Sequence, residues 1–256
     1  MVPFLFDVTF NIGNHAMPNW CKNTLEITAN TLAEFRQVFE KVMKFATEKQ
    51  QFCLDFNLLL PMPEALMLED NTSGENGFKL LSVEQELLVT DTLWEELRIF
   101  ANEDTKTHLL DMASKYQWRV TDLIHYLDQY PEEQQHCHID LGLARKYMAN
   151  VAKYGAKTWY DWRYQHWGVK WNAEQFYLSD IDETTKSFTV SFETAWNPPT
   201  NWFYTLIDTF PNIYCKLTYS EYEIGFTGVM SSKPEEEEYY EFDPWGEELI
   251  AEDTVH

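Results

Sequence analysis

The sequence predicts an α+β protein. Its core is an antiparallel sheet built on a split β-α-β unit, with helices on one face, an acidic and mostly helical insertion, and an acidic C-terminal tail. Stretches that alternate apolar and polar residues lie towards both ends of the chain, whereas the middle carries apolar residues at helical spacing. Charge is the third observation. The net charge is −23, and segments 64–140 (net −12) and 234–256 (net −10) hold nearly all of it.

The first part of the predicted sheet domain has a β-α-β pattern. Residues 24–29 alternate and predict a strand. Thr31 can cap the following helix, 32–46, whose apolar residues fall on one face. Residues 52–60 predict a second strand, which Pro61-Met62-Pro63 ends.

The acidic middle of the chain is predicted to be a loop followed by helices. Residues 64–82 have the composition of a loop, with Asn-Thr-Ser-Gly-Glu-Asn-Gly at 71–77 as its flexible centre. Apolar stripes at helical spacing then predict four helices, at 83–101, 106–118, 121–130 and 140–154. Gly155 suits a left-handed cap at the end of the last one.

Alternating patterns resume in the last third of the chain. Residues 174–180 and 186–196 predict a hairpin, and residues 213–222 and 224–230 predict another. Asn197-Pro198-Pro199 between the hairpins suits the start of a helix. The second half therefore reads β-β-α-β-β, which completes an antiparallel sheet.

The predicted organisation has five parts. They are an N-terminal extension (1–16), the first part of the sheet domain (17–63), the acidic helical insertion (64–155), the second part of the sheet domain (156–233) and the acidic aromatic tail (234–256). No stretch reaches the length of about 18–20 apolar residues that a spanning helix needs, and the start lacks the features of a signal peptide. Four scattered cysteines indicate free thiols in a reducing cytoplasm.

The stretch WYDWRYQHWGVKWNA, residues 159–173, contains four tryptophans. They could form a base-stacking platform, line a cofactor pocket or belong to the core. A stacking platform needs several basic neighbours, and only Arg163 and Lys170 are available. We therefore expect a core role, in which a helix that Gly168 ends is followed by a strand.

Three motifs resemble a known family. MPNWCKN at 17–23, the tryptophan stretch at 159–173 and AWNPP at 195–199 look like the YubB ferredoxin-like proteins of phages, prophages and conjugative plasmids. The resemblance implies a ferredoxin-like fold, a mobile-element origin and a location in the cytoplasm of a bacterial host. It implies no catalytic residues and no cofactor.

Two clusters of residues have side chains that could form a metal site or a catalytic site. His136-Cys137-His138, with Asp140 close by, has the residue types of a metal site but no second cluster to complete it, so a loop is the preferred interpretation and no metal is expected. Asp161 and His166 could form an acid–base pair, but no nucleophile motif accompanies them. The sequence therefore predicts a protein that is not an enzyme and has no cofactor.

The acidic charge points to a basic partner. Carboxylates repel DNA, RNA and anionic lipid and attract basic protein surfaces. The tail carries no base and should be extended or disordered when alone, yet aromatic residues interrupt its acids as anchors would. The predicted partner-binding residues are Glu235, Glu236, Glu237, Glu238, Tyr239, Tyr240, Glu241, Phe242, Asp243 and Trp245 in the tail, and Glu95, Glu96, Glu103 and Asp104 in the insertion.

The preferred hypothesis is a phage or plasmid accessory protein. It would bind and block a host protein that handles nucleic acid, such as restriction or CRISPR machinery, through surfaces that could mimic DNA. Direct binding to nucleic acid or to a membrane is not expected. Two alternatives stay open: a small-molecule or nucleotide-binding module or enzyme, with Asp161, His166 and the tryptophans lining its pocket, and a structural or host-takeover phage protein whose acidity only keeps it in solution.

Overall fold

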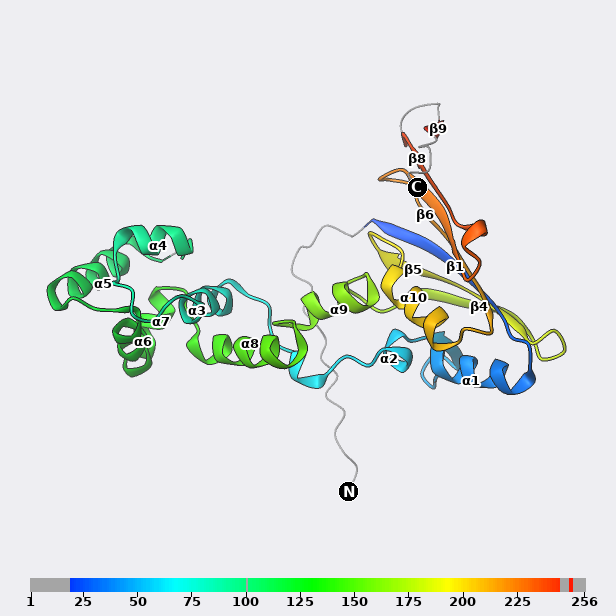
Figure 1. Ribbon diagram of the computed structural model, residues 1–256, viewed down its shortest axis with the longest axis horizontal. Helices are drawn as coiled ribbons and strands as arrows, with labels where there is room; N and C mark the ends of the chain where they lie inside the picture. The colour runs from blue at the N-terminus through cyan, green and yellow to red at the C-terminus, as the bar shows by residue number, and fades with distance from the viewer. Residues whose placement is uncertain (1–18, 100, 245–248, 251–256) are drawn as a thin grey trace, which may run out of the picture. The chain divides into compact units, whose positions relative to one another are not determined.

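The chain divides into two compact units. The computed structural model describes residues 19–99, 101–244 and 249–250. A sheet unit comprises residues 1–59 and 171–256, and a helical unit comprises residues 60–170 (Figure 1). Residues 156–170, which the sequence assigned to the sheet domain, lie in the helical unit.

The sheet unit contains a seven-stranded antiparallel sheet with the order β4-β5-β1-β6-β7-β8-β9. In chain order, β1, α1, β4, β5, α10 and β6 make the β-α-β-β-α-β arrangement of a ferredoxin-like fold, so the predicted α+β class is confirmed. The strands are β1 (Trp20–Thr28), β4 (Glu174–Asp182), β5 (Ser187–Ala195), β6 (Tyr214–Glu221), β7 (Phe226–Ser231), β8 (Glu238–Phe242) and β9 (Leu249–Ile250).

Helices cover one face of this sheet. In β1 the side chains of Cys21, Asn23, Leu25 and Ile27 are buried, whereas their neighbours in the strand are more exposed. Helix α1 (Leu32–Val42) begins with a capping box between Thr31 and Glu34. Its buried face reaches the sheet where the Phe35 ring lies 6.0 Å from that of Phe188 in β5. The other helix bounds are α2 (Phe56–Leu59) and α10 (Thr200–Thr209).

The prediction of a helix over 32–46 and a strand over 52–60 in the main sheet was wrong. Helix α1 ends at Val42, and β2 (Met43–Ala46) pairs with β3 (Gln51–Leu54) in a separate two-stranded sheet. Residues beyond β3 turn into α2, whose Phe56 packs against Trp202 and Phe192. A short apolar run fits a buried helical turn as well as a strand, and packing decides between them.

The helical unit contains one apolar core formed by several helices. Buried side chains of this core include Leu80, Trp94, Leu109, Leu123 and Leu141. None of the described helices combines the length and apolar content that crossing a membrane requires. The elements are η1 (Glu64–Leu66), α3 (Thr72–Ser82), α4 (Asp91–Leu97), α5 (Glu103–Tyr116), α6 (Val120–Gln129), α7 (Pro131–His136), α8 (Leu141–Tyr154) and α9 (Trp159–Trp167).

The flexible loop predicted at 71–77 is the start of helix α3. The Asn71 side chain caps the helix by accepting from the Gly74 amide at 2.8 Å. A Cβ at Gly74 would lie 2.6 Å from Leu143, and one at Gly77 would lie 2.7 Å from the carbonyl oxygen of Asp140. These glycines therefore allow close packing against α8, a long-range contact that the loop-like composition concealed.

The helix predicted over 83–101 is also much shorter than expected. Only Asp91–Leu97 is helical, and Leu87 and Leu88 lie before it. These two leucines are 42% and 51% exposed, so they do not belong to an apolar stripe that faces the core. Residues 83–90 instead run beside the end of α5, where the Val89 amide donates to the Trp118 carbonyl at 2.9 Å.

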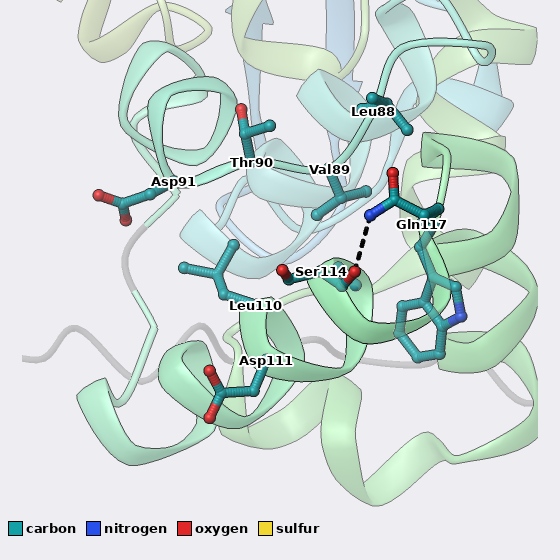
Figure 2. A pocket seen from close by; sticks show the side chains of 10 residues that line it. Leu88, Val89, Thr90, Asp91, Leu110, Asp111, Ser114 and Gln117 are labelled. Atoms are coloured by element: carbon teal, nitrogen blue, oxygen red, sulfur yellow. Dashed lines mark hydrogen bonds between the residues drawn. The ribbon is translucent and has the colours of Figure 1, made fainter.

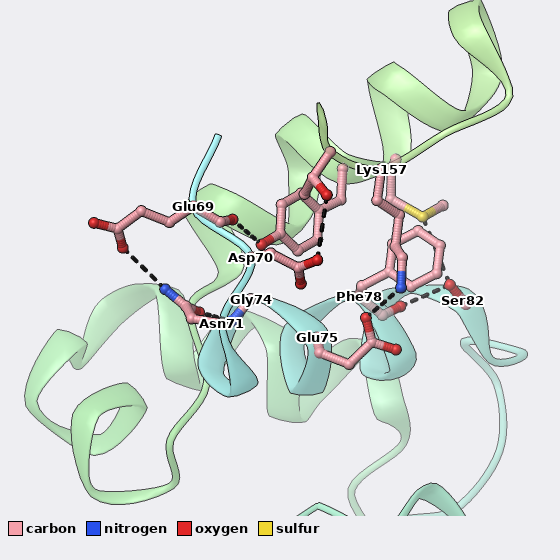
Figure 3. A network of polar contacts seen from close by, with 11 residues as sticks. Glu69, Asp70, Asn71, Gly74, Glu75, Phe78, Ser82 and Lys157 are labelled. Carbon is pink, nitrogen blue, oxygen red and sulfur yellow. Dashed lines mark hydrogen bonds and ion pairs between the residues drawn. The ribbon is translucent and has the colours of Figure 1, made fainter. Parts of the chain in front are cut away.

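Polar contacts join residues 69–75, at and before the start of α3, to Tyr147 in α8 and to Lys157 and Thr158 after it (Figure 3). The Thr158 hydroxyl donates to Asp70 at 3.3 Å, and Lys157 forms an ion pair with Glu75 at 2.6 Å. The Tyr147 hydroxyl donates to the carbonyl oxygen of Glu69. Burial raises the pKa of Tyr147 to about 12, so the hydroxyl stays protonated and remains a donor. This network fixes the segment that leads into α3.

Candidate functional site

The acidic tail forms an edge of the sheet. Its residues 238–242 are strand β8, which pairs antiparallel with β7 (Figure 1). Of the two states expected for the tail alone, extended or disordered, this stretch adopts the extended one, and it is paired with the sheet. Repulsion between carboxylates opposes a compact state, but backbone pairing and side-chain contacts with the sheet outweigh it here.

Two glycines in β7 and its turn make room for β8. Gly225 has a φ of +93°, and a Cβ there would collide with the carbonyl oxygen of Phe242. The Phe242 amide donates to the Gly225 carbonyl at 2.8 Å. A Cβ at Gly228 would lie 2.6 Å from the Glu238 carbonyl oxygen. The close approach of β8 thus requires glycine at positions 225 and 228. This requirement is recognised only once the pairing of β7 with β8 is known.

Two of the four consecutive glutamates are bound within the chain. The Tyr214 hydroxyl donates to Glu236 at 2.6 Å, and Ser231 and Lys233 also contact this carboxylate. These donors lower the pKa of Glu236, the Tyr214 hydroxyl most of all. Glu237 accepts from the Tyr204 hydroxyl at 3.1 Å. Glu236 and Glu237 therefore anchor the tail, although the sequence offered them only as partner-binding residues.

The remaining tail residues divide between the two faces of β8. Because facing residues of paired strands share a face, Glu238 lies beside Val229, and Tyr240 lies beside Thr227, on the face away from the helices. Tyr239 and Glu241 lie on the other face, where the Tyr239 hydroxyl donates to Glu241 at 2.7 Å. Each face of the strand therefore presents one carboxylate beside one tyrosine.

An aromatic corner extends the face that carries Glu238 and Tyr240. The Phe242 ring lies 6.0 Å from that of Tyr222, and the Lys22 ammonium lies 5.9 Å from the Tyr222 ring centre. Tyr222 is 61% exposed. We call Tyr222, Glu238, Tyr240 and Phe242 the acidic–aromatic corner. Sequence reasoning missed Tyr222, because only strand register brings it to the tail.

The other predicted partner-binding residues are spread over the molecule. Asp243 follows β8 and is exposed, as is Glu235 within the short helix η2 (Pro234–Glu236), and Trp245 lies outside the described residues. The remaining four belong to the helical unit and are exposed: Glu95 and Glu96 in α4, and Glu103 and Asp104 in the first turn of α5. The tail residues and these four thus belong to different units.

The tryptophan stretch has a structural role on both sides of its glycine. Within the helical unit Trp167 is fully buried, and its indole donates to the Leu60 carbonyl at 3.1 Å. Within the sheet unit Asn172 accepts from the Phe56 amide at 2.8 Å and donates to Asp55 at 2.8 Å. Trp167 therefore ties the last part of the helical unit to its first residue, Leu60. Asn172 does the same in the sheet unit, where it binds residues 55 and 56 just before the inserted segment.

The candidate catalytic and metal residues take ordinary structural positions. The His166 ring stacks on Trp162 at 4.1 Å and contacts the Trp162 carbonyl at 2.9 Å. Asp140 caps helix α8 by accepting from the Leu143 amide at 2.8 Å. Cys137 is buried, which raises its pKa to about 12. Across the described ranges no group of three or more His, Cys, Asp or Glu side chains could hold a metal ion.

The sheet face away from the helices is polar along its central strands. Thr24 in β1 and Ser191 in β5 face each other there, with their hydroxyl oxygens 3.3 Å apart. Sheets that bind single-stranded RNA on this face carry stacking aromatic side chains on their central strands. In the middle of β1 and β5 this sheet presents hydroxyl groups at this face.

One comparison, with a protein-family model, agrees with the fold of the C-terminal part. A family model described as the ferredoxin-like domain in Api92-like protein matches residues 166–254. The crystal structure of protein api92 from Yersinia pseudotuberculosis is similar over 88% of this chain and 98% of its own, at 12% sequence identity and a TM-score of 0.38. No curated protein is similar enough to count as a match. The C-terminal part of the chain thus carries a ferredoxin-like domain.

Proposed function

We propose that this chain is a non-enzymatic accessory protein of a phage or plasmid. It binds and inhibits a basic host protein that handles nucleic acid, such as a restriction or CRISPR component. The mobile-element origin rests on the resemblance of MPNWCKN and the tryptophan stretch to the YubB ferredoxin-like proteins.

The observation that carries this proposal is the acidic strand β8, which pairs with β7 in fixed register next to the last strand of the sheet. A disordered acidic tail would have to lose conformational entropy on binding, whereas paired strand residues have already lost it. On one face of β8, Glu238 can meet basic groups while Tyr240 and Tyr222 fill pockets as aromatic anchors; Glu241 offers a carboxylate on the opposite face. Such a surface attracts the lysines and arginines that a nucleic-acid-binding protein uses for phosphates.

The binding-module alternative has less support from the contacts. Trp162 and Trp167 are buried, and His166 is engaged with Trp162. Arg163 lies over the rings of both Trp159 and Trp167, at 5.1 and 4.9 Å. The rings therefore pack against one another, whereas the buried Nε of Arg163 has no hydrogen-bond partner among the described residues and is an atom that a ligand could satisfy. Thermal stabilisation of the whole chain by a nucleotide would reinstate this alternative.

The test uses three variants of the tagged full-length chain in a pull-down from bacterial lysate at low salt. Glu238→Gln combined with Glu241→Gln removes charge, and Tyr240→Ala removes an anchor, while the Glu236 and Glu237 anchors remain. The charge-matched control, Glu40→Gln with Glu48→Gln, changes two exposed acids outside the tail.

We expect one dominant DNA- or RNA-handling partner that duplex DNA competes off and that high salt releases. The tail variants should retain several-fold less of it than the control. Absence of a partner, or a partner that neither salt nor the tail variants weaken, would refute the proposal. The solubilising alternative predicts that all these variants behave alike.

A further inference from the structure

The helical unit has a cavity of about 400 Å³ between the segment before α4 and the C-terminal half of α5 (Figure 2). Its apolar lining includes Val89, Leu110 and Trp118, and its acidic lining consists of Asp91 and Asp111. Figure 2 shows the two aspartates at one end with Leu110 between them, and Gln117 at the other end. The cavity is therefore apolar along its wall and acidic at one end.

Three features make this cavity favourable for a positive charge. Helix α5 ends at Tyr116, so its C-terminal carbonyl groups and their partial negative charge lie at the cavity. Asp91 already binds one cation, the ammonium of Lys106, at 2.8 Å. Asp111 has no ion-pair partner among the described residues. The nearest lysine along the helix, Lys115, lies over the Tyr116 ring at 4.9 Å.

We propose that this cavity receives a long basic side chain, arginine or lysine, from a partner protein. The aliphatic stem lies along Val89 and Leu110, and the cationic head meets the acidic end at Asp111. This inference rests on the proposed function, since it supplies one specific contact for a basic partner. It places that contact at residues the sequence did not single out, separate from the acidic–aromatic corner.

Charge and polarity argue against other occupants. An anion would face the carboxylate of Asp111 and the negative end of α5, and a wholly apolar group would remove that carboxylate from water without a partner. A bare ion would leave the apolar wall unused. Arginine and lysine combine an apolar stem with a charged head, and both commonly bury the stem while the head stays at the polar rim.

The test is an NMR titration of the ¹⁵N-labelled full chain with three small probes. These are the N-acetyl methylamides of arginine, of lysine and of citrulline, the last having the shape of arginine without its charge. The signals to follow are the amides of Ser114 and Gln117 and the indole of Trp118. The variant is Asp111→Asn, and Glu132→Gln, an exposed acid in α7, is the matched control.

We expect saturable shifts of these signals with the basic probes and at least about tenfold weaker binding of citrulline. Asp111→Asn should weaken the basic probes about two- to fivefold, the range for a partly exposed charge pair, while Glu132→Gln should change nothing. The tighter of the two basic probes identifies the side chain.

Equal binding of citrulline, shifts that map outside the cavity, or full affinity in Asp111→Asn would overturn the inference. Such a failure would not contradict a pull-down partner that binds the acidic–aromatic corner. Conversely, basic probes that bind here while no basic protein is captured would refute the proposed function and keep the cavity assignment. The two experiments therefore fail independently.

Discussion

Replacing Gly225 by alanine should detach β8 from the sheet. An L-residue at φ +93° costs about 1–2 kcal/mol. The added Cβ would also collide with the Phe242 carbonyl oxygen and lie 2.8 Å from Pro244. The chain can relieve this contact by moving Phe242 away, which breaks the 2.8 Å hydrogen bond to Gly225 and forfeits about 0.5–1.5 kcal/mol. The expected loss is therefore about 1.5–3.5 kcal/mol.

Gly155→Ala is the matched control for backbone strain. Gly155 also has a left-handed φ, +73°, but a Cβ there meets nothing within 4 Å. It should cost only the strain of about 1–2 kcal/mol. Each variant is measured by urea unfolding followed in its own unit, and hydrogen exchange of the β8 amides reports local detachment.

We expect the β8 amides of Gly225→Ala to exchange at least about tenfold faster, and those of Gly155→Ala to be unchanged, since each 1.4 kcal/mol changes an opening equilibrium tenfold. The partner of the acidic–aromatic corner should then bind Gly225→Ala about as weakly as it binds the tail variants. Equal destabilisation by the two alanines, with unchanged β8 exchange, would show that the β7–β8 turn does not need the space we assign to it.

Three further outcomes follow from single contacts. Trp167→Ala should destabilise the helical unit by about 3–5 kcal/mol, measured by urea unfolding, because it empties a buried site and removes the bond to Leu60. In the folded chain the pKa of Glu236 lies below its ordinary 4.5. The Glu236 carboxylate therefore stabilises the fold fully above pH 4.5, and this stabilisation is lost as the pH falls through the folded pKa. Tyr214→Phe should raise this pKa in a carbon-detected NMR titration. Iodoacetamide at pH 8 should modify Cys53 first, as mass spectrometry will show. Burial raises the pKa of the other three thiols to about 12 (Cys21, Cys137 and Cys215).

The sequence predicted well those elements whose signals are local. Strand β5 alternates strictly enough to define its buried face, and Gly155 and Gly168 end their helices in the left-handed conformation. Asn197-Pro198-Pro199 stands directly before α10, which begins at Thr200. In each case the signal is local, because glycine readily adopts a positive φ and proline fixes its own φ whatever surrounds it.

The failures share a dependence on contacts far along the chain. Gly74 and Gly77 resemble loop residues until α8 packs on them. The tail resembles a solvated segment until Tyr214 and Ser231 bind Glu236. For the candidate site, the sequence therefore supplied the chemistry of the tail but neither its anchoring nor its faces. The sequence also could not predict the cavity, since no local pattern shows that Asp111 and Val89 line the same pocket.

The position of the insertion explains why the sheet tolerates it. The central strand β1 pairs with β5 and β6, so Trp20 faces Ala195 and every partner of β1 lies beyond the insertion. Closing such a long loop costs entropy that grows with the logarithm of its length. The inserted unit shortens the effective loop, because Trp167 bonds to Leu60 at its two ends and Asn172 bonds to Asp55 just outside them. A unit of contiguous sequence with local contacts can fold first and present these ends to the sheet. The tryptophan stretch is therefore constrained by chain closure.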